Sequence, residues 1–438
     1  MTLSAKQSLP HAAEPRTRVQ RASGVPHRVV AATVAGNALE FYDFVAYAFF
    51  AVYIGKTFFP ASTPLGSLLL SLAVFGVGFV ARPLGGVVIG AFADRAGRRA
   101  ALLLTIALIT IGTLGLALTP SYESIGVAAP IIVVVCRLIQ GLALGGEVGP
   151  SAAFLIEAAP PGGRGIYGSW ILASQGAGVL VAGLLGMGLS ATLSPADMLA
   201  WGWRVPFVVG IALLPIALYL RRTMPETLHT ESVEAANSGM TGLKRHRVLM
   251  MLAVLLIIGG TVSTYVGNYM TTYAIATLKM APSLAMGATV VGGLCTLLFA
   301  LLGGWLSDRY GRRMTMFWPR VAAAVLTVPA FMLLIAQPTG PVLLAVSGFL
   351  AALTAISGAA SLVAIPELLP SGIRATGMAI VYAVGVALFG GTTQFIITWL
   401  IGATGNPAAP AWYVAGASVI TALAMLAVPE SRDRALEN

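Results

Sequence analysis

Apolar side chains dominate the 438-residue chain: 57% of its residues are hydrophobic, only 10% are charged, and its formal net charge is +10. Soluble domains carry about 25% charged residues, so this composition excludes an ordinary soluble globular protein. Apolar runs of about 20 residues recur along the chain instead, which indicates a protein that crosses a membrane several times.

We predict twelve membrane-spanning helices. In chain order they cover residues 29–52, 67–92, 100–119, 127–150, 166–189, 203–220, 248–273, 284–306, 314–336, 341–363, 375–401 and 411–428. Glycines inside these spans are expected, because small residues let membrane helices approach closely.

The basic residues set the orientation. Outside the spans, nearly all Lys and Arg fall in segments that lie on one side, and only Lys56 and Lys279 fall in loops on the other. The positive-inside rule therefore places both termini in the cytoplasm. This pattern accounts for the net charge without nucleic acid, and residues 1–28 read as a polar tail and not as a cleaved signal peptide.

One long polar connection, residues 222–247, divides the spans into two sets. We expect an all-α membrane protein with a six-helix bundle at residues 29–221, a second at 248–428, and cytoplasmic tails at 1–28 and 429–438.

A ten-residue motif occurs once in each half, and each copy ends one apolar run and precedes another. Six positions are identical, which indicates a duplicated chain with a short cytoplasmic loop at equivalent places. The matching residues are Gly90, Asp94, Arg95, Gly97, Arg98 and Arg99 in the first copy, and Gly304, Asp308, Arg309, Gly311, Arg312 and Arg313 in the second.

This organisation resembles the major facilitator superfamily of secondary transporters. Further stretches are similar to its metabolite:proton symporter family, whose members carry citrate and tricarballylate, 2-oxoglutarate, shikimate, or proline and betaine. Those stretches are residues 36–44, 82–86, 137–147, 201–207 and 366–377. The resemblance implies alternating access of two bundles around a central site, driven by the proton gradient.

Two arginines, Arg82 and Arg137, fall near the middle of predicted spans. An ionised side chain there costs roughly 2.5 to 3.5 kcal/mol, so each needs a functional or structural reason. A guanidinium offers a planar fork that fits a carboxylate, which favours an organic anion as substrate. The alternative is that both arginines pair with interior carboxylates and join helices.

Proton coupling requires a titrating group, and all four histidines lie in the N-terminal tail or the central loop. We therefore expect a carboxylate to carry the proton. Glu40 and Asp43, within about 60° of each other on one helix, are the first candidates, and Glu147 is the next. The alternative is that Glu40 and Asp43 hold the inner arginines and never titrate.

Other polar residues inside the spans are candidate substrate ligands, because amides and hydroxyls in an apolar helix suit hydrogen bonds to substrate oxygens. The same residue types also join helices to each other. The candidates are Asn37, Tyr42, Gln140, Tyr265, Asn268, Tyr269, Tyr382 and Gln394. Arg320, in the ninth span, could extend to the inner surface.

Acids and bases gather at the cytoplasmic ends of the spans. We interpret them as a gate whose ion pairs between the halves hold the inner face closed, a role that the family resemblance assigns to the Asp94 and Asp308 motifs. Topology signals and helix caps are the simpler reading. Besides the doubled motif, this set includes Glu157, Arg164, Glu367 and Arg374.

The expected function is proton-coupled uptake of a small organic anion, a di- or tricarboxylate such as citrate, by a monomer in the inner (plasma) membrane of a bacterium. Alternatives are a zwitterion, osmolyte or shikimate-type symporter of the same family, or a proton-driven drug exporter. We expect no enzyme activity, cofactor or metal, because no catalytic or phosphate-binding motif appears, and Cys136 and Cys295 read as packed free thiols.

Overall fold

The computed structural model describes residues 27–96, 98–145, 155–156, 159–160, 162–212, 246–369 and 371–432. At residues 27–29, 32, 90, 93–95, 98–99, 102, 371–376 and 379 it describes the backbone alone. Every regular element in this part of the chain is helical. Both cysteines are free thiols, as predicted.

Eight described helices are long and apolar enough to cross a membrane, and a bent helix pair makes a ninth. Three shorter apolar helices, Leu103–Leu118, Ala128–Leu144 and Gly202–Ala212, occupy the places of the third, fourth and sixth predicted spans. The predicted all-α, multi-pass fold with twelve helices is thereby confirmed. The predicted boundary between residues 221 and 222 lies outside the described residues.

The first half differs from the prediction in its first span. A 63° bend separates two helices there, and the break lies at Phe50, whose ring is fully buried in the core of this half. The single helix predicted at residues 29–52 is therefore wrong. The helices of this half are α1 (His27–Phe49), α2 (Ala51–Phe58), α3 (Pro64–Ala96), α4 (Arg98–Leu118), α5 (Tyr122–Ile125), α6 (Ala128–Leu144), α8 (Arg164–Thr192) and α9 (Pro195–Ala200).

The second half departs from the prediction in its eleventh span. A π-helical segment, η2 (Gly385–Gly390), interrupts it between α16 (Ser371–Val384) and α17 (Gly391–Thr404). Such segments are rare and occur often at functional sites. The other helices are α12 (Arg247–Ala276), α13 (Pro282–Tyr310), α14 (Arg312–Ala336), α15 (Gly340–Leu368) and α18 (Ala409–Leu426).

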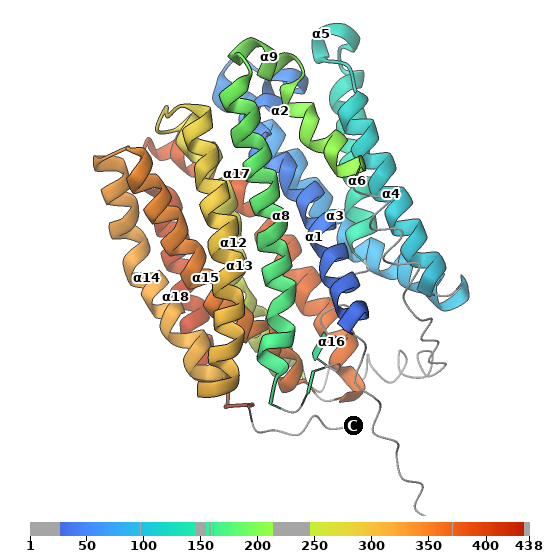
Figure 1. Cartoon of the computed structure of the whole chain (residues 1–438), viewed down its shortest axis with the longest axis vertical. Helices are drawn as coiled ribbons and strands as arrows, with labels where there is room; N and C mark the ends of the chain where they lie inside the picture. The colour runs from blue at the N-terminus through green and yellow to red at the C-terminus, as the bar shows by residue number, and fades with distance from the viewer. Residues whose placement is uncertain are drawn as a thin grey trace, which may run out of the picture.

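Two long helices, α8 and α13, join the halves along the middle of the molecule (Figure 1). Glycines make this contact close, because a Cβ at Gly176 would meet the backbone of Leu297, and one at Gly304 would meet Ser169. A second contact between the halves lies where Gly76 of α3 meets Gly391 of α17. Small residues thus set the distance between the bundles.

A third glycine-lined contact, between α3 and α6, positions the two inner arginines. A Cβ added at Gly141 would overlap the carbonyl oxygen of Gly78, and one at Gly145 would overlap that of Arg82. The two backbones therefore approach as closely as they do only because no side chain lies between them. This contact brings Arg82 of α3 and Arg137 of α6 to one place.

We expect Gly141→Ala to destabilise the protein by about 1 to 3 kcal/mol, the usual cost of overpacking a filled interior. Thermal unfolding of the purified protein in detergent measures the change. Gly188→Ala is the matched control, because a Cβ there meets no atom within 4 Å. Equal stability of the two variants would contradict the assigned helix contact.

Candidate substrate and proton site

The two inner arginines lie in a cage of aromatic rings. The guanidinium carbon of Arg137 is 4.8 Å from the ring centre of Phe44 and 4.5 Å from that of Tyr47. That of Arg82 is 4.4 Å from the ring centre of Phe44 and 4.1 Å from that of Phe79. Cation–π attraction at these distances contributes about 0.5 to 2 kcal/mol for each contact. The sequence predicted the buried arginines but not their cage.

A glutamine connects Arg137 to Asp43. Arg137 donates from Nη1 to Oε1 of Gln140 at 2.8 Å, and Gln140 donates from Nε2 to Oδ2 of Asp43 at 3.0 Å. Thr113 of α4 donates to the same Oδ2 at 2.6 Å. Arg137 and Asp43 are therefore coupled without a direct ion pair. Thr113 was missed from the sequence, where it is one of several threonines in an apolar span.

Several polar atoms of this cluster have no hydrogen-bond partner in the described part of the chain. They are Oδ1 of Asp43, Nε of Arg82, and Nε and Nη2 of Arg137. Asp43 is only 5% exposed and Arg137 fully buried. Because buried polar groups are nearly always satisfied by protein, water or ligand, these atoms mark places where a ligand or water can bind.

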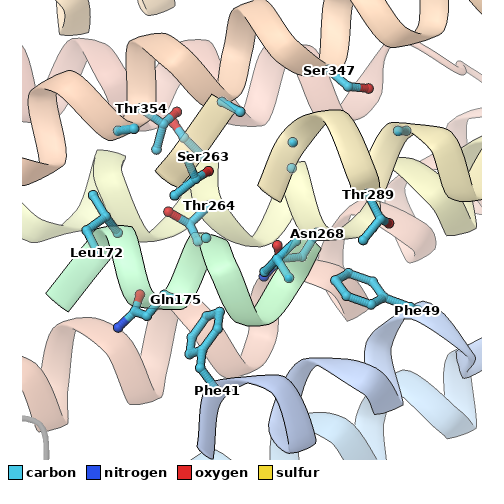
Figure 2. A pocket seen from close by; sticks show the side chains of 18 residues that line it. Phe41, Phe49, Leu172, Gln175, Ser263, Thr264, Asn268, Thr289, Ser347 and Thr354 are labelled. Carbon is cyan, nitrogen blue, oxygen red and sulfur yellow. The ribbon is translucent and has the colours of Figure 1, made fainter. Parts of the chain in front are cut away.

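A cavity lies between the two halves, and Figure 2 shows its lining side chains. None of the lining residues, all in the described part of the chain, is charged. Asn268 of α12 and Ser347 of α15 each present a buried polar atom there that has no partner among the described residues. Asn268 was a predicted ligand; the other polar lining residues, Gln175, Ser263, Thr264, Thr289, Thr296, Ser347 and Thr354, were not.

A smaller hollow lies beside α1, α4 and the Gly202–Ala212 helix. Glu40 and Asp43 both line it, so the predicted neighbours do share one space. Glu147, the other candidate for the proton, lies outside the described residues.

Three predicted ligands make contacts that join helices. Asn37 of α1 donates to Oγ of Ser174 at 2.7 Å, and the Tyr42 hydroxyl donates to the carbonyl oxygen of Pro206 at 2.7 Å. The Tyr269 hydroxyl accepts a hydrogen bond of 2.8 Å from Thr398. These bonds favour the structural alternative for all three.

The remaining candidates lie in the second half. Tyr265 of α12 packs edge-on against Phe79 of the arginine cage, 5.3 Å between ring centres, and its hydroxyl faces Arg82. Gln394 donates to the backbone oxygen of Tyr265 at 3.3 Å. Tyr382 packs instead against a separate apolar cluster. Tyr265 thus brings the second half into contact with the cage.

Arg320 of α14 is 1% exposed, so it does not extend to the inner surface. It donates from Nη1 to the carbonyl oxygen of Gly259 at 2.9 Å and to Oγ of Ser263 at 3.0 Å. Because Ser263 also lines the large cavity, Arg320 supports the cavity wall from behind.

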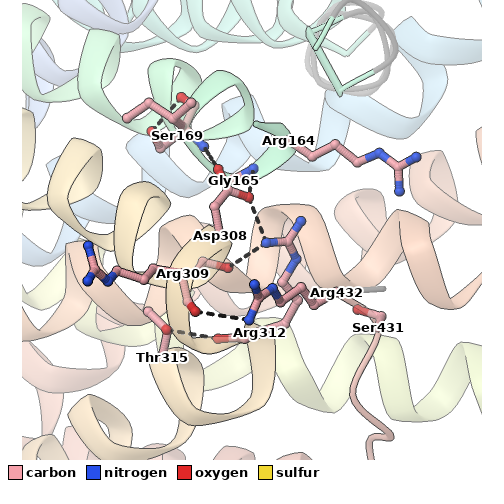
Figure 3. A network of polar contacts seen from close by, with 12 residues as sticks. Arg164, Gly165, Ser169, Asp308, Arg309, Arg312, Thr315, Ser431 and Arg432 are labelled. Carbon is pink, nitrogen blue, oxygen red and sulfur yellow. Dashed lines mark hydrogen bonds and ion pairs between the residues drawn. The ribbon is translucent and has the colours of Figure 1, made fainter. Parts of the chain in front are cut away.

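At the cytoplasmic end, the second copy of the motif ties the halves together (Figure 3). The Asp308 carboxylate accepts hydrogen bonds from the backbone N–H groups of Gly165 and Ile166, at 2.7 and 2.9 Å. These groups belong to the first turn of α8, where a helix end attracts negative charge. Arg312 donates to Asp308 at 2.8 Å.

Glu367 completes this network. Arg312 binds its carboxylate with two nitrogens, at 3.1 and 3.2 Å, and Arg164 of the first half lies 3.6 Å from it. Ion pairs and hydrogen bonds therefore link the halves at this end; their action as a gate stays a prediction.

The C-terminal segment adds a contact that sequence reasoning missed. The Glu430 carboxylate accepts the backbone N–H groups of Arg312 and Arg313 at 2.8 and 3.0 Å, which caps α14. Burial alone would raise the pKa of Glu430, but these and two further N–H donors outweigh it and hold the pKa below its usual value. Ser431 donates to Glu367 at 2.7 Å. An acid directly after the last apolar run was the only signal.

The other predicted gate residues make local contacts or cannot be assessed. The Arg309 guanidinium lies 5.4 Å from the Trp305 ring centre, and Arg313 donates to the Leu426 carbonyl oxygen at 3.2 Å. Gly311 has a φ of +98°, which glycine tolerates. Gly97 and Glu157 lie outside the described residues. The structure describes only the backbone of Gly90, Asp94, Arg95, Arg98, Arg99 and Arg374.

We expect Asp308→Asn to weaken the contact between the halves at the cytoplasmic end. The amide lacks the negative charge of the carboxylate, which accepts hydrogen bonds from two backbone N–H groups and from Arg312. The loss of about 1.5 to 3 kcal/mol corresponds to about a tenfold to hundredfold shift in population. The measurement is the labelling rate of Ser169→Cys, in a chain without Cys136 and Cys295, by an impermeant thiol reagent added at the cytoplasmic side. Arg309→Gln is the control, and equal rates in both variants would argue against a gate at Asp308.

Comparison with known proteins shows that the chain is similar in sequence to membrane transporters. The chain is 35% identical over 404 residues to the citrate-proton symporter of Salmonella typhi, which covers 91% of this chain and 93% of the relative. It is 34% identical to the alpha-ketoglutarate permease of Escherichia coli K12 (90% and 91% covered) and 31% identical to the proline/betaine transporter of that strain (94% and 85% covered).

The fold matches solved transporters. A crystal structure of a D-xylose-proton symporter superimposes with a TM-score of 0.76 at 21% identity, over 94% of this chain and 99% of that one. The sequence also matches the family described as "Sugar (and other) transporter" over residues 29–246 and 229–438. The chain therefore belongs to the sugar (and other) transporter family of the major facilitator superfamily, and it is a membrane transporter and not an enzyme.

Proposed function

We propose that this transporter imports a small organic anion together with protons, by alternating access, and that the anion is a di- or tricarboxylate such as citrate. The observation that carries the proposal is the pair of buried arginines: three of their N–H-bearing nitrogens have no acceptor in the described residues. A carboxylate supplies acceptor atoms and the opposite charge.

The aromatic cage favours an anion over a quaternary ammonium compound. Cations of the betaine type bind to the faces of aromatic rings, but guanidinium groups already lie over Phe44, Tyr47 and Phe79. A further cation there would meet like charge. The relatives named for citrate and alpha-ketoglutarate point the same way.

Asp43 carries the proton in this proposal, with Glu40 as the second carboxylate. When Asp43 is ionised, Gln140 and Thr113 direct their donors to it, and the charge of Arg137 is partly compensated through Gln140. Protonation of Asp43 removes that compensation, so the cage attracts an anion more strongly. Binding of the proton then raises the affinity for the anion, and binding of the anion raises the affinity for the proton. This positive coupling is the requirement for symport.

The ion pairs around Asp308 and Glu367 form the cytoplasmic gate of the proposed cycle, and the protein works as a monomer in the inner membrane of a bacterium. The gate opens when Asp308 releases the first turn of α8 and Arg164 leaves Glu367. The cavity between the halves then faces the cytoplasm.

Uptake into proteoliposomes with an imposed pH gradient, acid outside, tests the proposal. The panel is labelled citrate, 2-oxoglutarate, shikimate, proline and glycine betaine, with a cationic dye for drug export. We expect a carboxylate to accumulate only with the gradient, and a protonophore to abolish the accumulation. Accumulation of proline or betaine alone would instead establish the osmolyte function, which the proline/betaine relative also suggests.

A further inference from the structure

We propose that protons reach Asp43 through the smaller hollow beside α1, α4 and the Gly202–Ala212 helix, and not through the cavity that lies between the halves. The hollow is then a proton-access site, occupied by water or hydronium, inside the N-terminal bundle. This inference rests on the proposed role of Asp43 as the proton carrier.

The helix α1 separates the two spaces. Phe41 and Phe49 line the cavity between the halves, whereas Glu40 and Asp43 line the hollow. Phe44 lies between these two faces on the helix surface, and its ring contacts the guanidinium groups of Arg82 and Arg137. Three faces of one helix therefore meet the cavity, the cage and the hollow, so a proton and an anion can approach the cluster from different sides.

The two oxygens of Asp43 have different surroundings. Oδ2 accepts hydrogen bonds from Thr113 and Gln140, whereas Oδ1 is buried and has no partner in the described residues. Oδ1 is thus the atom free to accept a proton. The carboxylate can bind it there without losing either hydrogen bond at Oδ2.

A glycine, and not a side chain, lies beside Oδ1 of Asp43 at the hollow. A Cβ at Gly210 would lie 3.2 Å from Oδ1 of Asp43 and 3.3 Å from Cε1 of Tyr42. The Tyr42 ring is held by the bond from its hydroxyl to Pro206, so it cannot easily make room. A methyl group at position 210 would therefore lie directly over Oδ1, whereas glycine places no side chain between Oδ1 and the hollow.

The charged groups that face Asp43 fit this route. In the described residues they are Glu40, on the same wall of the hollow, and Arg137, which reaches Asp43 through Gln140 from the other side. A negative group on the hollow side attracts hydronium, and a positive group on the cage side attracts the anion. Hydronium gives its proton to Oδ1, an O–H bond forms, and a water molecule remains in the hollow.

Infrared spectroscopy of the full chain in lipid bilayers tests the route without any substrate. The C=O band of protonated Asp43 is identified by its absence in Asp43→Asn, and its rate of appearance and of deuterium exchange is followed after a jump in pH or into D₂O. We expect Gly210→Ala to slow both rates at least tenfold. Gly188→Ala, with open space around its Cβ, should behave as the unmodified chain does.

A second variant guards against a folding defect. Ile211→Phe fills the hollow from a neighbouring lining position, and thermal unfolding shows whether each variant is folded. Slow exchange in both folded variants supports the route. Unchanged exchange in either folded variant would overturn it while leaving Asp43 as the carrier, whereas absence of any Asp43 band across the pH range would overturn the carrier role as well.

Discussion

Arg137→Met should reduce carboxylate uptake severely, with a loss of at least about 30-fold in kcat/KM. Truncating one partner of a buried charge pair costs about 2 to 5 kcal/mol, and about 2 kcal/mol already equals about 30-fold. The change also leaves Oε1 of Gln140 without its donor, so Gln140 loses the bond that orients it toward Asp43. Initial rates of gradient-driven uptake in proteoliposomes measure the effect.

Two further variants separate charge from geometry. Arg137→Lys keeps the charge but loses the planar fork, so we expect partial activity with a raised KM. Arg313→Met removes an exposed guanidinium at the cytoplasmic end that donates to the Leu426 carbonyl oxygen, and its uptake should be close to that of the unmodified chain. Uptake by Arg137→Met at the rate of this control would refute the anion site.

Asp43→Asn should separate transport from the proton gradient. Asparagine has nearly the same shape and can still accept from Thr113, but it cannot take up a proton, so uphill accumulation should disappear. Exchange of labelled for unlabelled carboxylate across the membrane should continue, because it needs no net proton movement. Accumulation under an acid-outside gradient and counterflow without a gradient, measured on the same vesicles, distinguish the two activities.

Two other carboxylate variants serve as comparisons for Asp43→Asn. Glu40→Gln should also lose gradient-driven accumulation and retain counterflow if the two carboxylates act together. Asp197→Asn changes an exposed carboxylate in the first turn of α9, which accepts a hydrogen bond from Ser194, so both activities should persist. Full uphill accumulation by Asp43→Asn would exclude Asp43 as the carrier.

The glycine contacts explain why helix positions were easier to predict than helix partners. Apolar runs fixed the spans, yet the break at Phe50 and the π-helix at Gly385–Gly390 carry no proline or charge to mark them. Both lie at tertiary contacts: Phe50 is buried in the core, and Gly390 lies against Tyr265 and Phe79. Local sequence does not contain that information.

The cluster around Arg137 and Asp43 was likewise predictable in its members but not in its contacts. The cost of an ion in hydrocarbon drew attention to Arg82, Arg137, Glu40 and Asp43 from the sequence alone. It could not show that Gln140 stands between Arg137 and Asp43, or that Tyr42 is bonded to Pro206 and turned away from the cavity. The Gln140–Asp43 and Tyr42–Pro206 bonds each join residues of different helices.

The sequence alone determined that this protein is a duplicated bundle of membrane helices, with its basic loops on one side and a few charges buried in its interior. It could do so because hydropathy, charge and repetition are properties of single segments. Only the tertiary structure decided which buried groups meet. Helix periodicity gives the direction of each side chain from its own axis, but the partner that it meets depends on how closely α3 approaches α6 and α8 approaches α13.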